Sequence, residues 1–310
     1  MSEKCFSCNI RSTDQGLTEG YHPKCSRRLF GTVSPPIIPF GSGDIIREAH
    51  KMVGRMSISG VQPKLSVIHE NKKRMLTVVD RGGHYILKPP TEQFEELPEN
   101  ENLCMTIASD YGIEVPPQGL LPLQDNRLAY VVKRFDRMED GSKLQQEDFH
   151  QLLQTDDKYS GSYERIADFV KRHSAVPGLD LIRLFERALL FFVLANGDAH
   201  LKNFSLLRRE EVGYQFSPAY DIVNSRVVLP EEQEEMCLSI RGKKNRISRK
   251  DFINFAEHIR LTSKQSENSL ERLHALEPKI EEMIGESFLR SDLKESFLKT
   301  LRERMGRLFH

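Results

Sequence analysis

The sequence has no excess of charge of either sign, because Lys and Arg together number 45 and Asp and Glu also number 45. A net charge of zero gives no long-range attraction to nucleic acid or to an anionic membrane, so we expect no direct nucleic-acid binding. Hydrophobic residues make up 38% of the chain and charged residues 29%. That balance is typical of a globular protein and excludes a largely disordered one.

Long apolar runs are also missing. The longest, Ala188–Ala195, is far too short to cross a bilayer, and the N-terminus has no apolar core of a secretory signal peptide. The chain has only five cysteines, an odd number. Without an export signal, reduced thiols are the default. The sequence therefore predicts a cytoplasmic protein that makes no contact with a membrane.

Four side chains of types that bind metals lie close together in the sequence near the N-terminus. Cys5 and Cys8 are followed, after thirteen residues, by His22 and Cys25. Three thiolates and an imidazole form a tetrahedral set that suits Zn²⁺, and a short segment with little apolar content can gain its fold from such a metal. The alternative is that these cysteines are small buried hydrophobes. We expect that second role for Cys104 and Cys237.

Along the chain, the pattern changes from strands to helices. A connector rich in Pro and Gly, Gly31–Gly43, precedes a short predicted helix at Asp44–Val53. Short runs rich in β-branched or aromatic residues predict strands at 64–68, 75–79, 84–88, 119–123 and 128–132, with one helix at 99–111. After residue 136, apolar residues recur at helical spacing. The helix with Leu179, Ile182, Phe185 and Leu189 should be mostly buried. Two further helices should follow near the C-terminus.

These elements predict an α+β protein with a two-lobed, protein-kinase-like fold. We expect three parts: a Cys/His segment and connector at 1–43, a β-rich lobe at 44–135, and a helical lobe at 136–310. Nucleotide would bind in the cleft between the lobes. The stretch Gln146–His150 should begin a helix, with Glu147 and Asp148 at its positive end.

The segment Asn196–Asn203 carries the strongest functional signal. Asp198 and Asn203 are five positions apart, and a second acidic residue, Asp221, follows a predicted hairpin at 206–216. This is the D-x-x-x-x-N … D arrangement of kinase active sites. Asp198 would accept the proton of a substrate hydroxyl, while Asn203 and Asp221 would supply oxygen ligands to Mg²⁺. A surface loop with a helix cap is the alternative interpretation.

Other residues fit the same chemistry. Lys202 could balance negative charge on the transferring phosphoryl group, and His200 could contact phosphate or support the loop. Lys88 ends a predicted strand, where kinases place a lysine that binds phosphates. Either Glu101 or Glu99 could pair with it, and the sequence does not choose between them.

Two further stretches are candidates for nucleotide contacts. Gly54–Lys64 precedes the Lys88 strand but is not a G-x-G-x-x-G loop; its backbone N–H groups and serines could still bind phosphate. Phosphorylation there would add about −1.5 to −2 charges and repel ATP. The backbone of Lys133–Phe135 could bind the edge of adenine. The Phe135 side chain could pack on the adenine ring, or it could belong to the protein core.

Several motifs together resemble the HipA family of bacterial toxin kinases. They are Ser-Ile-Ser-Gly-Val-Gln-Pro-Lys (57–64), Ile-Leu-Lys (86–88), Arg-Phe-Asp-Arg (134–137), Gln-Glu-Asp-Phe (146–149), Gly-Asp-Ala-His-Leu-Lys-Asn-Phe (197–204) and Pro-Ala-Tyr-Asp-Ile (218–222). The resemblance runs from about residue 50 to the C-terminus. It implies a serine/threonine protein kinase toxin that uses ATP and Mg²⁺.

The resemblance also implies functional roles for individual residues. Asp198 would be the proton acceptor, Asn203 and Asp221 would hold Mg²⁺, and Lys88 would bind phosphates. The family modifies itself on a serine of its phosphate loop, which matches Ser57 by position and leaves Ser59 as a second acceptor. Further residues would line the ATP site: Ser59, Gly60, Val61, Gln62, Pro63, Lys64, Lys133, Arg134, Phe135, His200, Lys202 and Tyr220.

The chain is similar to the short HipT type, which lacks the N-terminal subdomain of full-length HipA toxins. The resemblance then implies three partners: a DNA-binding HipB-like antitoxin, a small HipS-like protein, and an aminoacyl-tRNA synthetase as substrate, tryptophanyl or glutamyl. Two alternatives stay open. One is a small-molecule kinase of the aminoglycoside phosphotransferase type, and the other is a pseudokinase that binds ATP as a scaffold.

Overall fold

The computed structural model describes residues 3–11, 16–45, 47, 62–94, 96–138, 140–229, 231 and 234–310. The chain forms two compact units. The N-terminal unit comprises Met1–Thr106, Pro116–Ser142 and Glu286–Leu289, and the C-terminal unit comprises Ile107–Val115, Lys143–Gly285 and Arg290–His310. The predicted three-part division of the chain stays a prediction. Most of the predicted helix at 44–53 lies outside the described residues.

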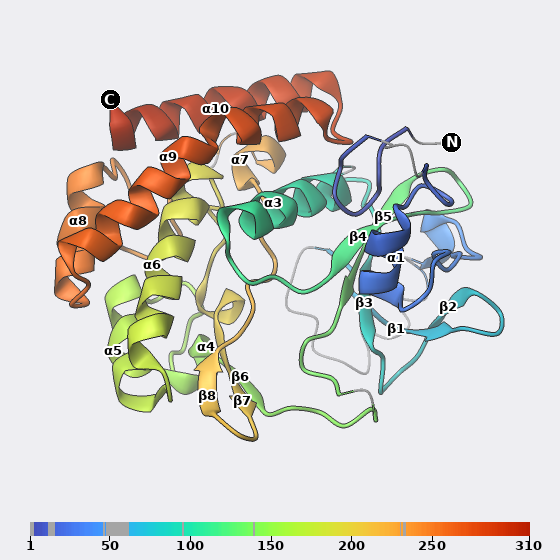
Figure 1. Ribbon diagram of the computed structural model, residues 1–310, viewed down its shortest axis with the longest axis horizontal. Helices are drawn as coiled ribbons and strands as arrows, with labels where there is room; N and C mark the ends of the chain where they lie inside the picture. Colours follow the sequence, from blue (N-terminus) through green and yellow to red (C-terminus); the bar gives the residue numbers. More distant parts are fainter. Residues whose placement is uncertain are drawn as a thin grey trace. The chain divides into compact units, whose positions relative to one another are not determined.

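The N-terminal unit is built on a five-stranded antiparallel sheet with the order β2-β1-β3-β5-β4 (Figure 1). Its strands are β1 (Leu65–Glu70), β2 (Met75–Val78), β3 (Tyr85–Lys88), β4 (Gln118–Pro122) and β5 (Leu128–Lys133). All five were predicted to within two residues at their ends. Their β-branched and aromatic residues fit a pleated, half-buried surface, which explains the agreement.

The two faces of this sheet differ in chemistry. Leu87 pairs with Leu65 and with Val131, so these three side chains share one face, which is buried. The helix α1 (Pro23–Phe30) covers that face, which we call the α1 face (Figure 1). Lys88 pairs with Tyr130, and both side chains lie on the opposite face, called the Lys88 face. Lys88 is therefore separated from α1 by the sheet.

The helix α1 was not predicted, although the sequence contains its signals. Pro23 stands in the first turn, and Gly31 ends the helix in the left-handed conformation at φ 76°. Leu29 and Phe30 are buried against the sheet. The helix α3 (Leu97–Tyr111) was predicted, and Gly112 ends it at φ 97°.

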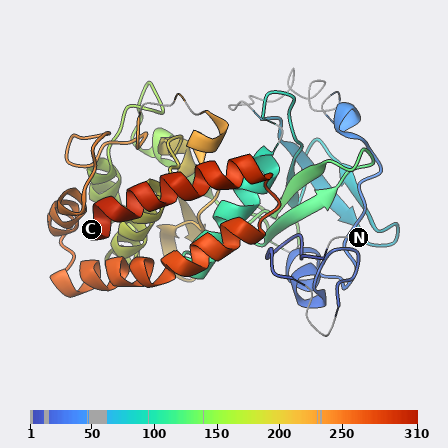
Figure 2. The same ribbon diagram turned by 90° about the horizontal axis from the view of Figure 1, so that it is seen from above.

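The C-terminal unit is mostly helical, with a small sheet in the order β6-β7-β8. Its strands are β6 (Gln146–Asp148), β7 (Ser205–Arg209) and β8 (Gly213–Phe216). Its helices are α4 (Phe149–Leu152), α5 (Tyr163–His173), α6 (Pro177–Val193), η1 (Leu201–Asn203), α7 (Ser225–Val228), α8 (Arg249–His258), α9 (Ser263–Glu286) and α10 (Ser291–Phe309). Helix α10 packs against α6, α7 and α8 (Figure 2).

Helix α6 forms the centre of this unit. From Leu184 to Val193 every residue is buried, as the apolar pattern predicted, and Phe185 packs against Phe252 and Phe255 of α8. One predicted core position is wrong, because Leu179 is 47% exposed. It lies in the first turn of α6, where the helix has not yet entered the core.

The stretch Gln146–Asp148 forms strand β6 and not the start of a helix. Gln146 pairs with Leu207, and Asp148 pairs with Ser205. Asp148 then caps α4, since its carboxylate accepts a 2.9 Å hydrogen bond from the Gln151 backbone N–H. The predicted electrostatic role of an acidic residue at this helix start is therefore confirmed for Asp148, while Glu147 lies in the strand.

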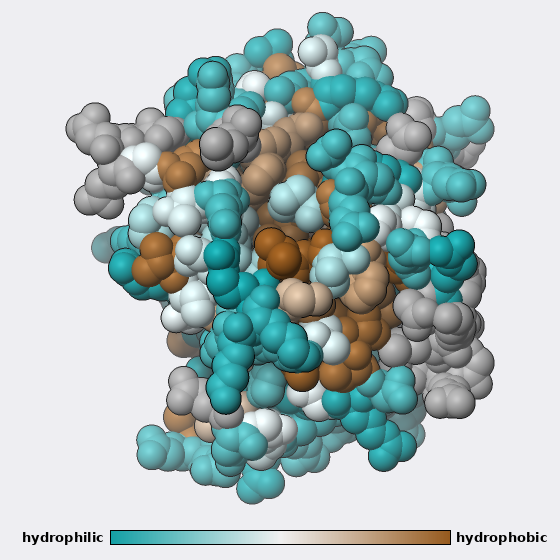
Figure 3. Space-filling view, turned by 90° about the vertical axis from the view of Figure 1, so that its right-hand side faces the viewer, coloured by the Kyte–Doolittle hydropathy of each residue, from teal (hydrophilic) through white to brown (hydrophobic). Residues whose placement is uncertain are grey.

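The surface of the N-terminal unit includes several large apolar side chains. The exposed ones within its first forty residues are Ile10, Val33, Ile37 and Phe40. Figure 3 shows apolar surface gathered in the middle of one face and surrounded by polar side chains.

Among the described residues, no helix has both the length and the hydropathy needed to span a membrane.

Candidate active site

In the C-terminal unit, the loop after α6 presents one acidic side chain to solvent and holds one amide inside. Asp198 is exposed, whereas Asn203 is 7% exposed. The chain leaves α6 through Ala195, whose φ of 52° lies in the left-handed region that few non-glycine residues adopt. The backbone changes direction at Ala195, directly after the buried helix, and Asp198 follows three residues later. An exposed carboxylate on a rigid support suits a group that meets a substrate.

Ser225 supports this loop from the start of α7. Its hydroxyl donates to the Ala195 carbonyl at 3.0 Å and accepts from the Gly197 backbone N–H at 2.9 Å. The Ser225 backbone N–H also donates to Ala195 O at 3.0 Å. The hydrogen bonds fix the backbone on the N-terminal side of Asp198. On the other side, the Leu201 N–H donates to the Lys158 carbonyl at 3.1 Å.

Asn203 is oriented by the loop that contains it. Its side-chain oxygen accepts a hydrogen bond from the His200 backbone N–H at 3.1 Å. An amide oxygen has two lone pairs, so this contact leaves acceptor capacity for a cation. The His200 imidazole lies edge-on to the Tyr159 ring, with centroids 5.5 Å apart, and the residue is buried. His200 therefore packs against Tyr159, and a contact of its side chain with phosphate stays a prediction.

Tyr220 joins the Asn203 loop to the segment of Asp221. Its hydroxyl lies 2.9 Å from the Lys202 carbonyl oxygen and 3.1 Å from the Ser205 hydroxyl oxygen. Lys202 is adjacent to Asn203, and Tyr220 is adjacent to Asp221. The hydrogen bond between Tyr220 and Lys202 therefore joins the residues directly before Asp221 and Asn203, the two predicted metal ligands. Burial raises the pKa of Tyr220, which keeps the phenol protonated as a donor.

The backbone of Asp221 is held in an uncommon conformation, with φ at 55°. Left-handed non-glycine residues carry a conformational cost and occur often at functional sites. The preceding segment is held by Arg187 of α6, which donates to the Ser217 carbonyl and stacks over the Phe216 ring, 4.3 Å from its centroid. Burial lowers the pKa of Arg187 to about 9, which still leaves the guanidinium charged at neutral pH.

The predicted core cysteine Cys237 is buried, and so is Cys104. Burial, followed by the negative charge of Asp198, raises the pKa of Cys237 to about 12. The thiol therefore stays neutral at physiological pH. It is not poised as a nucleophile, because nucleophilic cysteines need a lowered pKa.

In the N-terminal unit, Lys88 pairs with Glu101 and not with Glu99. The Lys88 Nζ and Glu101 Oε1 atoms are 2.5 Å apart, and the two side chains are 4% and 2% exposed. Lys88 Nζ also lies 5.4 Å from the centroid of the Tyr130 ring. The strand β3 and helix α3 thus hold a buried lysine and a carboxylate in contact, which is the pairing that kinases use to position a phosphate-binding lysine.

The predicted phosphate loop is only partly described. Ser57, Ser59, Gly60 and Val61 lie outside the described residues, as does the rest of 48–61. Gln62 is buried, and its side-chain amide donates to the Pro89 carbonyl at 2.9 Å. Pro63 and Lys64 follow it, half-buried, into β1. The end of the loop is therefore fixed directly beside the residue that follows Lys88.

The predicted adenine-binding stretch begins at the end of β5. Lys133 pairs with Tyr85, so its side chain lies on the α1 face, opposite Lys88. Its backbone N–H donates to Pro117 O, and that of Arg134 donates to His84 O, both at 2.8 Å. The Arg134 guanidinium binds Asp136 through two bonds of 2.8 and 2.7 Å. Contacts of this stretch with a nucleotide stay a prediction.

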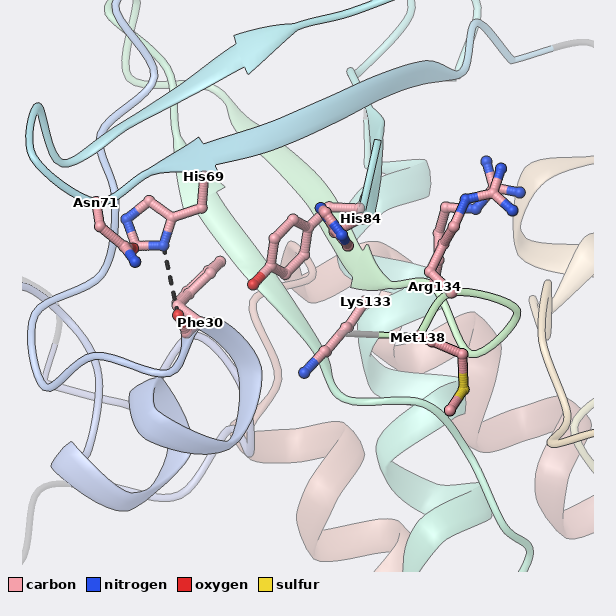
Figure 4. Close-up of a pocket in the computed structure, with 9 residues that line it drawn as sticks. Phe30, His69, Asn71, His84, Lys133, Arg134 and Met138 are labelled. Carbon is pink, nitrogen blue, oxygen red and sulfur yellow. Dashed lines mark hydrogen bonds between the residues drawn. The ribbon is translucent and has the colours of Figure 1, made fainter. Parts of the chain in front are cut away.

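A cavity of about 340 Å³ opens on the α1 face (Figure 4). Aromatic and basic side chains line it: Phe30, His69, Asn71, His84, Tyr85, Lys133, Arg134, Arg137 and Met138. The imidazole of His69 lies 3.4 Å from the Phe30 carbonyl oxygen, and burial lowers the pKa of His69. Because this cavity and Lys88 lie on opposite faces of the sheet, a nucleotide bound by Lys88 would not occupy it.

The four N-terminal metal-binding side chains come together as the sequence predicted. One ligand atom from each of Cys5, Cys8, His22 and Cys25 lies within 4.8 Å of all the others. The Cys8 Sγ and His22 Nδ1 atoms are 3.5 Å apart. Cys5 Sγ accepts a hydrogen bond from the His22 backbone N–H at 3.4 Å.

The three thiols of this cluster shift one another's ionisation. Hydrogen bonds from Cys25 and Cys8 to the Cys5 thiolate lower the pKa of Cys5 to about 2. Donating to that thiolate raises the pKa of Cys25 to about 11 and raises that of Cys8 as well. One negative charge therefore forms easily in the cluster, and further charges need a compensating cation.

Sequence reasoning did not find the residues that support the site. Ser225 and Arg187 make their contacts with residues 28 to 30 positions away along the chain. Neither belongs to a local motif, so no spacing rule could select them. Tyr220 was expected to line the nucleotide site, but its hydrogen bonds to Lys202 and Ser205 were not foreseen.

The chain is similar to a known protein family and to proteins named as putative kinases. The model of the HipA-like C-terminal domain family matches residues 56–280. A Haemophilus influenzae protein named "Putative kinase" is 28% identical over 319 residues, which cover 94% of this chain and 91% of that protein. Two Sinorhizobium fredii proteins also named as putative kinases, Y4mE and Y4dM, are 32% and 31% identical. The matches cover 64% and 71% of this chain, but only 48% and 57% of those proteins.

Two solved structures share the fold. HipA from Shewanella oneidensis, in its complex with HipB and operator DNA, gives a TM-score of 0.69 at 20% identity, covering 87% of this chain and 71% of that one. The Helicobacter pylori proinflammatory kinase CtkA gives 0.53 at 19% identity, covering 72% and 86%. The predicted α+β, kinase-like fold is therefore confirmed.

Proposed function

Because the chain belongs to the HipA-like C-terminal domain family and has a kinase-like fold, we propose that it is an ATP-dependent serine/threonine protein kinase acting as a toxin. The observation that best supports this function is the arrangement in the C-terminal unit. An exposed Asp198 lies five residues before a buried Asn203, on a loop hydrogen-bonded through Tyr220 to the segment of Asp221.

In the proposed reaction, a serine or threonine oxygen of the substrate attacks the γ-phosphorus of ATP. The new O–P bond forms as the bond between the γ-phosphorus and the bridging β-γ oxygen breaks, and ADP leaves. Asp198 accepts the hydroxyl proton, which requires a carboxylate that is ionised and accessible. General bases of this kind contribute about 10²- to 10⁴-fold to a rate.

Asn203 and Asp221 would hold Mg²⁺, since amide and carboxylate oxygens suit this hard cation. The bound ion would neutralise charge on the phosphates. Lys88 is proposed to bind phosphate, with Glu101 keeping its side chain extended and charged. Lys202 is proposed to balance charge on the transferring group.

We further propose that the kinase regulates itself through Ser57 or Ser59. A phosphate on either residue would place negative charge in a loop that otherwise approaches the phosphates of ATP. Gln62, anchored to Pro89, would hold the C-terminal end of that loop in place.

The partners follow from the family. The Shewanella oneidensis HipA was solved with HipB and DNA, which supports a HipB-like antitoxin as the partner that contacts DNA. By the resemblance to the short HipT type, we propose a small HipS-like protein as a further partner. We propose an aminoacyl-tRNA synthetase as the substrate.

The first test is the mass of the purified chain after incubation with Mg²⁺ and ATP, followed by mapping of phosphopeptides. We expect a phosphate on Ser57 or Ser59 in the wild type and none in Asp198→Asn. The double variant Ser57→Ala, Ser59→Ala should also gain no phosphate. Since Asp198 is exposed, its replacement by Asn should leave the chain folded, which thermal unfolding checks.

The same experiment can contradict the proposal in two ways. Phosphate on Asp198→Asn at the wild-type level would remove Asp198 from the reaction. No phosphate on the wild type, together with ATP consumption only when a small hydroxylated compound is added, would indicate a small-molecule kinase.

A further inference from the structure

The first thirty residues carry a cluster that the proposed kinase reaction does not use. Cys5, Cys8, His22 and Cys25 belong to the N-terminal unit, on the α1 face, and none of them is needed for phosphoryl transfer. Cys5 is fully buried, and the other three are partly buried. Three thiol sulfurs and an imidazole nitrogen converge within 4.8 Å of one another, which is the donor set of a structural zinc site.

The distances fit a tetrahedral Zn²⁺ site. Zinc–sulfur bonds of about 2.3 Å and zinc–nitrogen bonds of about 2.0 to 2.1 Å give a sulfur–nitrogen edge of roughly 3.6 Å in a tetrahedron. The Cys8 Sγ to His22 Nδ1 distance is 3.5 Å. The remaining ligand atoms lie within 4.8 Å of these two and of each other. The hydrogen bond from the His22 N–H to Cys5 Sγ is the kind of outer contact that stabilises a metal-bound thiolate.

The backbone presents the four ligands in two pairs. Cys5 and Cys8 lie in a tight turn closed by bonds from the Cys5 N–H to Ile10 O and from the Asn9 N–H to Cys5 O, both 2.9 Å. His22 directly precedes α1, and Cys25 is in its first turn. A turn and a helix start are thus brought together, and the ligand cluster lies where they meet.

This segment also covers the edge of the sheet. The Leu120 N–H of the edge strand β4 donates to Phe6 O at 2.8 Å, and the Ser7 hydroxyl donates to Gln118 O at 2.7 Å. The buried Tyr21 hydroxyl donates to Leu120 O at 2.6 Å. An exposed edge strand invites pairing with other chains, so its coverage has structural value.

We infer that Cys5, Cys8, His22 and Cys25 bind one structural Zn²⁺ ion, which fixes residues 3–11 and 16–30 over strand β4 and the α1 face of the N-terminal unit. The set is closed, with four protein ligands and no position for water or substrate, so the ion is structural and not catalytic. The inference goes beyond the proposed kinase function and does not depend on it.

The test is the metal content of the full-length chain, purified without chelators and measured by elemental mass spectrometry. We expect about one zinc ion per chain in the wild type, as for other sites with four protein ligands. Cys8→Ser and Cys25→Ser should lose most of it. The control is Cys104→Ala, which removes a cysteine of the same unit outside the cluster and should keep the wild-type content.

A second pair of variants guards against loss by misfolding. His22→Cys keeps four ligands and should retain zinc, whereas His22→Ala should bind it more weakly. Hydrogen exchange on the wild type should show faster exchange in β4 and β5 after chelation, with no change in α6. Wild-type protein that neither contains zinc nor takes it up, or wild-type zinc content in Cys8→Ser, would overturn the inference. So would a disulfide among Cys5, Cys8 and Cys25 in the chain as purified under reducing conditions, because oxidised sulfurs cannot serve as thiolate ligands. Each of these results is independent of any phosphorylation assay.

Discussion

Glu99 and Glu101 lie two positions apart on α3, yet their surroundings give them different chemistry. Residues at this spacing do not share a face of a helix. Glu101 meets Lys88, whereas Glu99 is 8% exposed, and its buried Oε2 has no hydrogen-bond partner among the described residues. Desolvation raises the pKa of Glu99 to about 8. The sequence could not choose between the two carboxylates, because the choice depends on the orientation of α3 against β3.

The raised pKa of Glu99 predicts a pH-dependent stability. Its carboxyl keeps its proton up to about pH 8 in the folded chain but loses it near the ordinary glutamate pKa of 4.5 when unfolded. Between these values the folded state binds more protons, so the free energy of unfolding falls as pH rises. Glu99→Gln cannot ionise and should lack this loss. Urea unfolding of both proteins should show the variant gaining a few kcal/mol over the wild type between about pH 5 and pH 8.

The control for this measurement is Glu92→Gln, which replaces an exposed carboxylate of the same unit. Its stability difference from the wild type should be the same at all pH values tested. A difference between Glu99→Gln and the wild type that stays constant with pH would mean that Glu99 is ionised in the folded protein.

Among the elements, strand β4 depends on a close approach that only glycine permits. A Cβ atom on Gly119 would lie 2.6 Å from the Tyr21 hydroxyl oxygen and 3.2 Å from the Phe6 carbonyl oxygen. Real Cβ atoms do not approach a neighbour to 2.6 Å, and the contacts come from two separate parts of the N-terminal segment. Gly119 was predicted as the first residue of a strand, but this contact with residues 6 and 21 depends on tertiary structure.

Gly119→Ala should therefore lower the free energy of unfolding by about 1 to 3 kcal/mol, as overpacking usually does. The matched control is Gly306→Ala in α10, where nothing lies within 4 Å of the added carbon. That change should raise stability by about 0.5 to 1 kcal/mol through helix propensity. Urea unfolding measures both effects. Equal stability of Gly119→Ala and the wild type would show that the N-terminal segment moves away from β4 at no cost.

At the scale of the whole molecule, binding of Mg²⁺ and ATP should raise the stability of the folded chain. A ligand at a hundred times its dissociation constant adds about 2.7 kcal/mol when it binds only the folded state. Asp221→Asn removes a proposed metal ligand and should lose this gain when Mg²⁺ is present. Asp198→Asn, which removes only the proposed proton acceptor, should keep it. Thermal unfolding with and without Mg²⁺ and ATP measures the difference. An unchanged gain in Asp221→Asn would exclude Asp221 as a metal ligand.

The sequence by itself determined most of the elements and the residue types that carry the chemistry, although helix α1 was missed and Gln146–Asp148 was assigned to a helix. Strands β1 to β5 and helix α6 follow from side-chain periodicity, because local propensity and burial act over neighbouring residues. The Cys/His cluster and the Asp198, Asn203 and Asp221 set are likewise visible as spacings.

Only the tertiary structure decided how these parts are held. In the folded chain Lys88 pairs with Glu101. Gln146–Asp148 forms a strand because it pairs with β7, and Leu179 is exposed. The tertiary structure also linked the Asn203 loop to the Asp221 segment through Tyr220 and supported it with Ser225. Such contacts join residues far apart in the chain, so they depend on packing and hydrogen-bond geometry that no local pattern encodes.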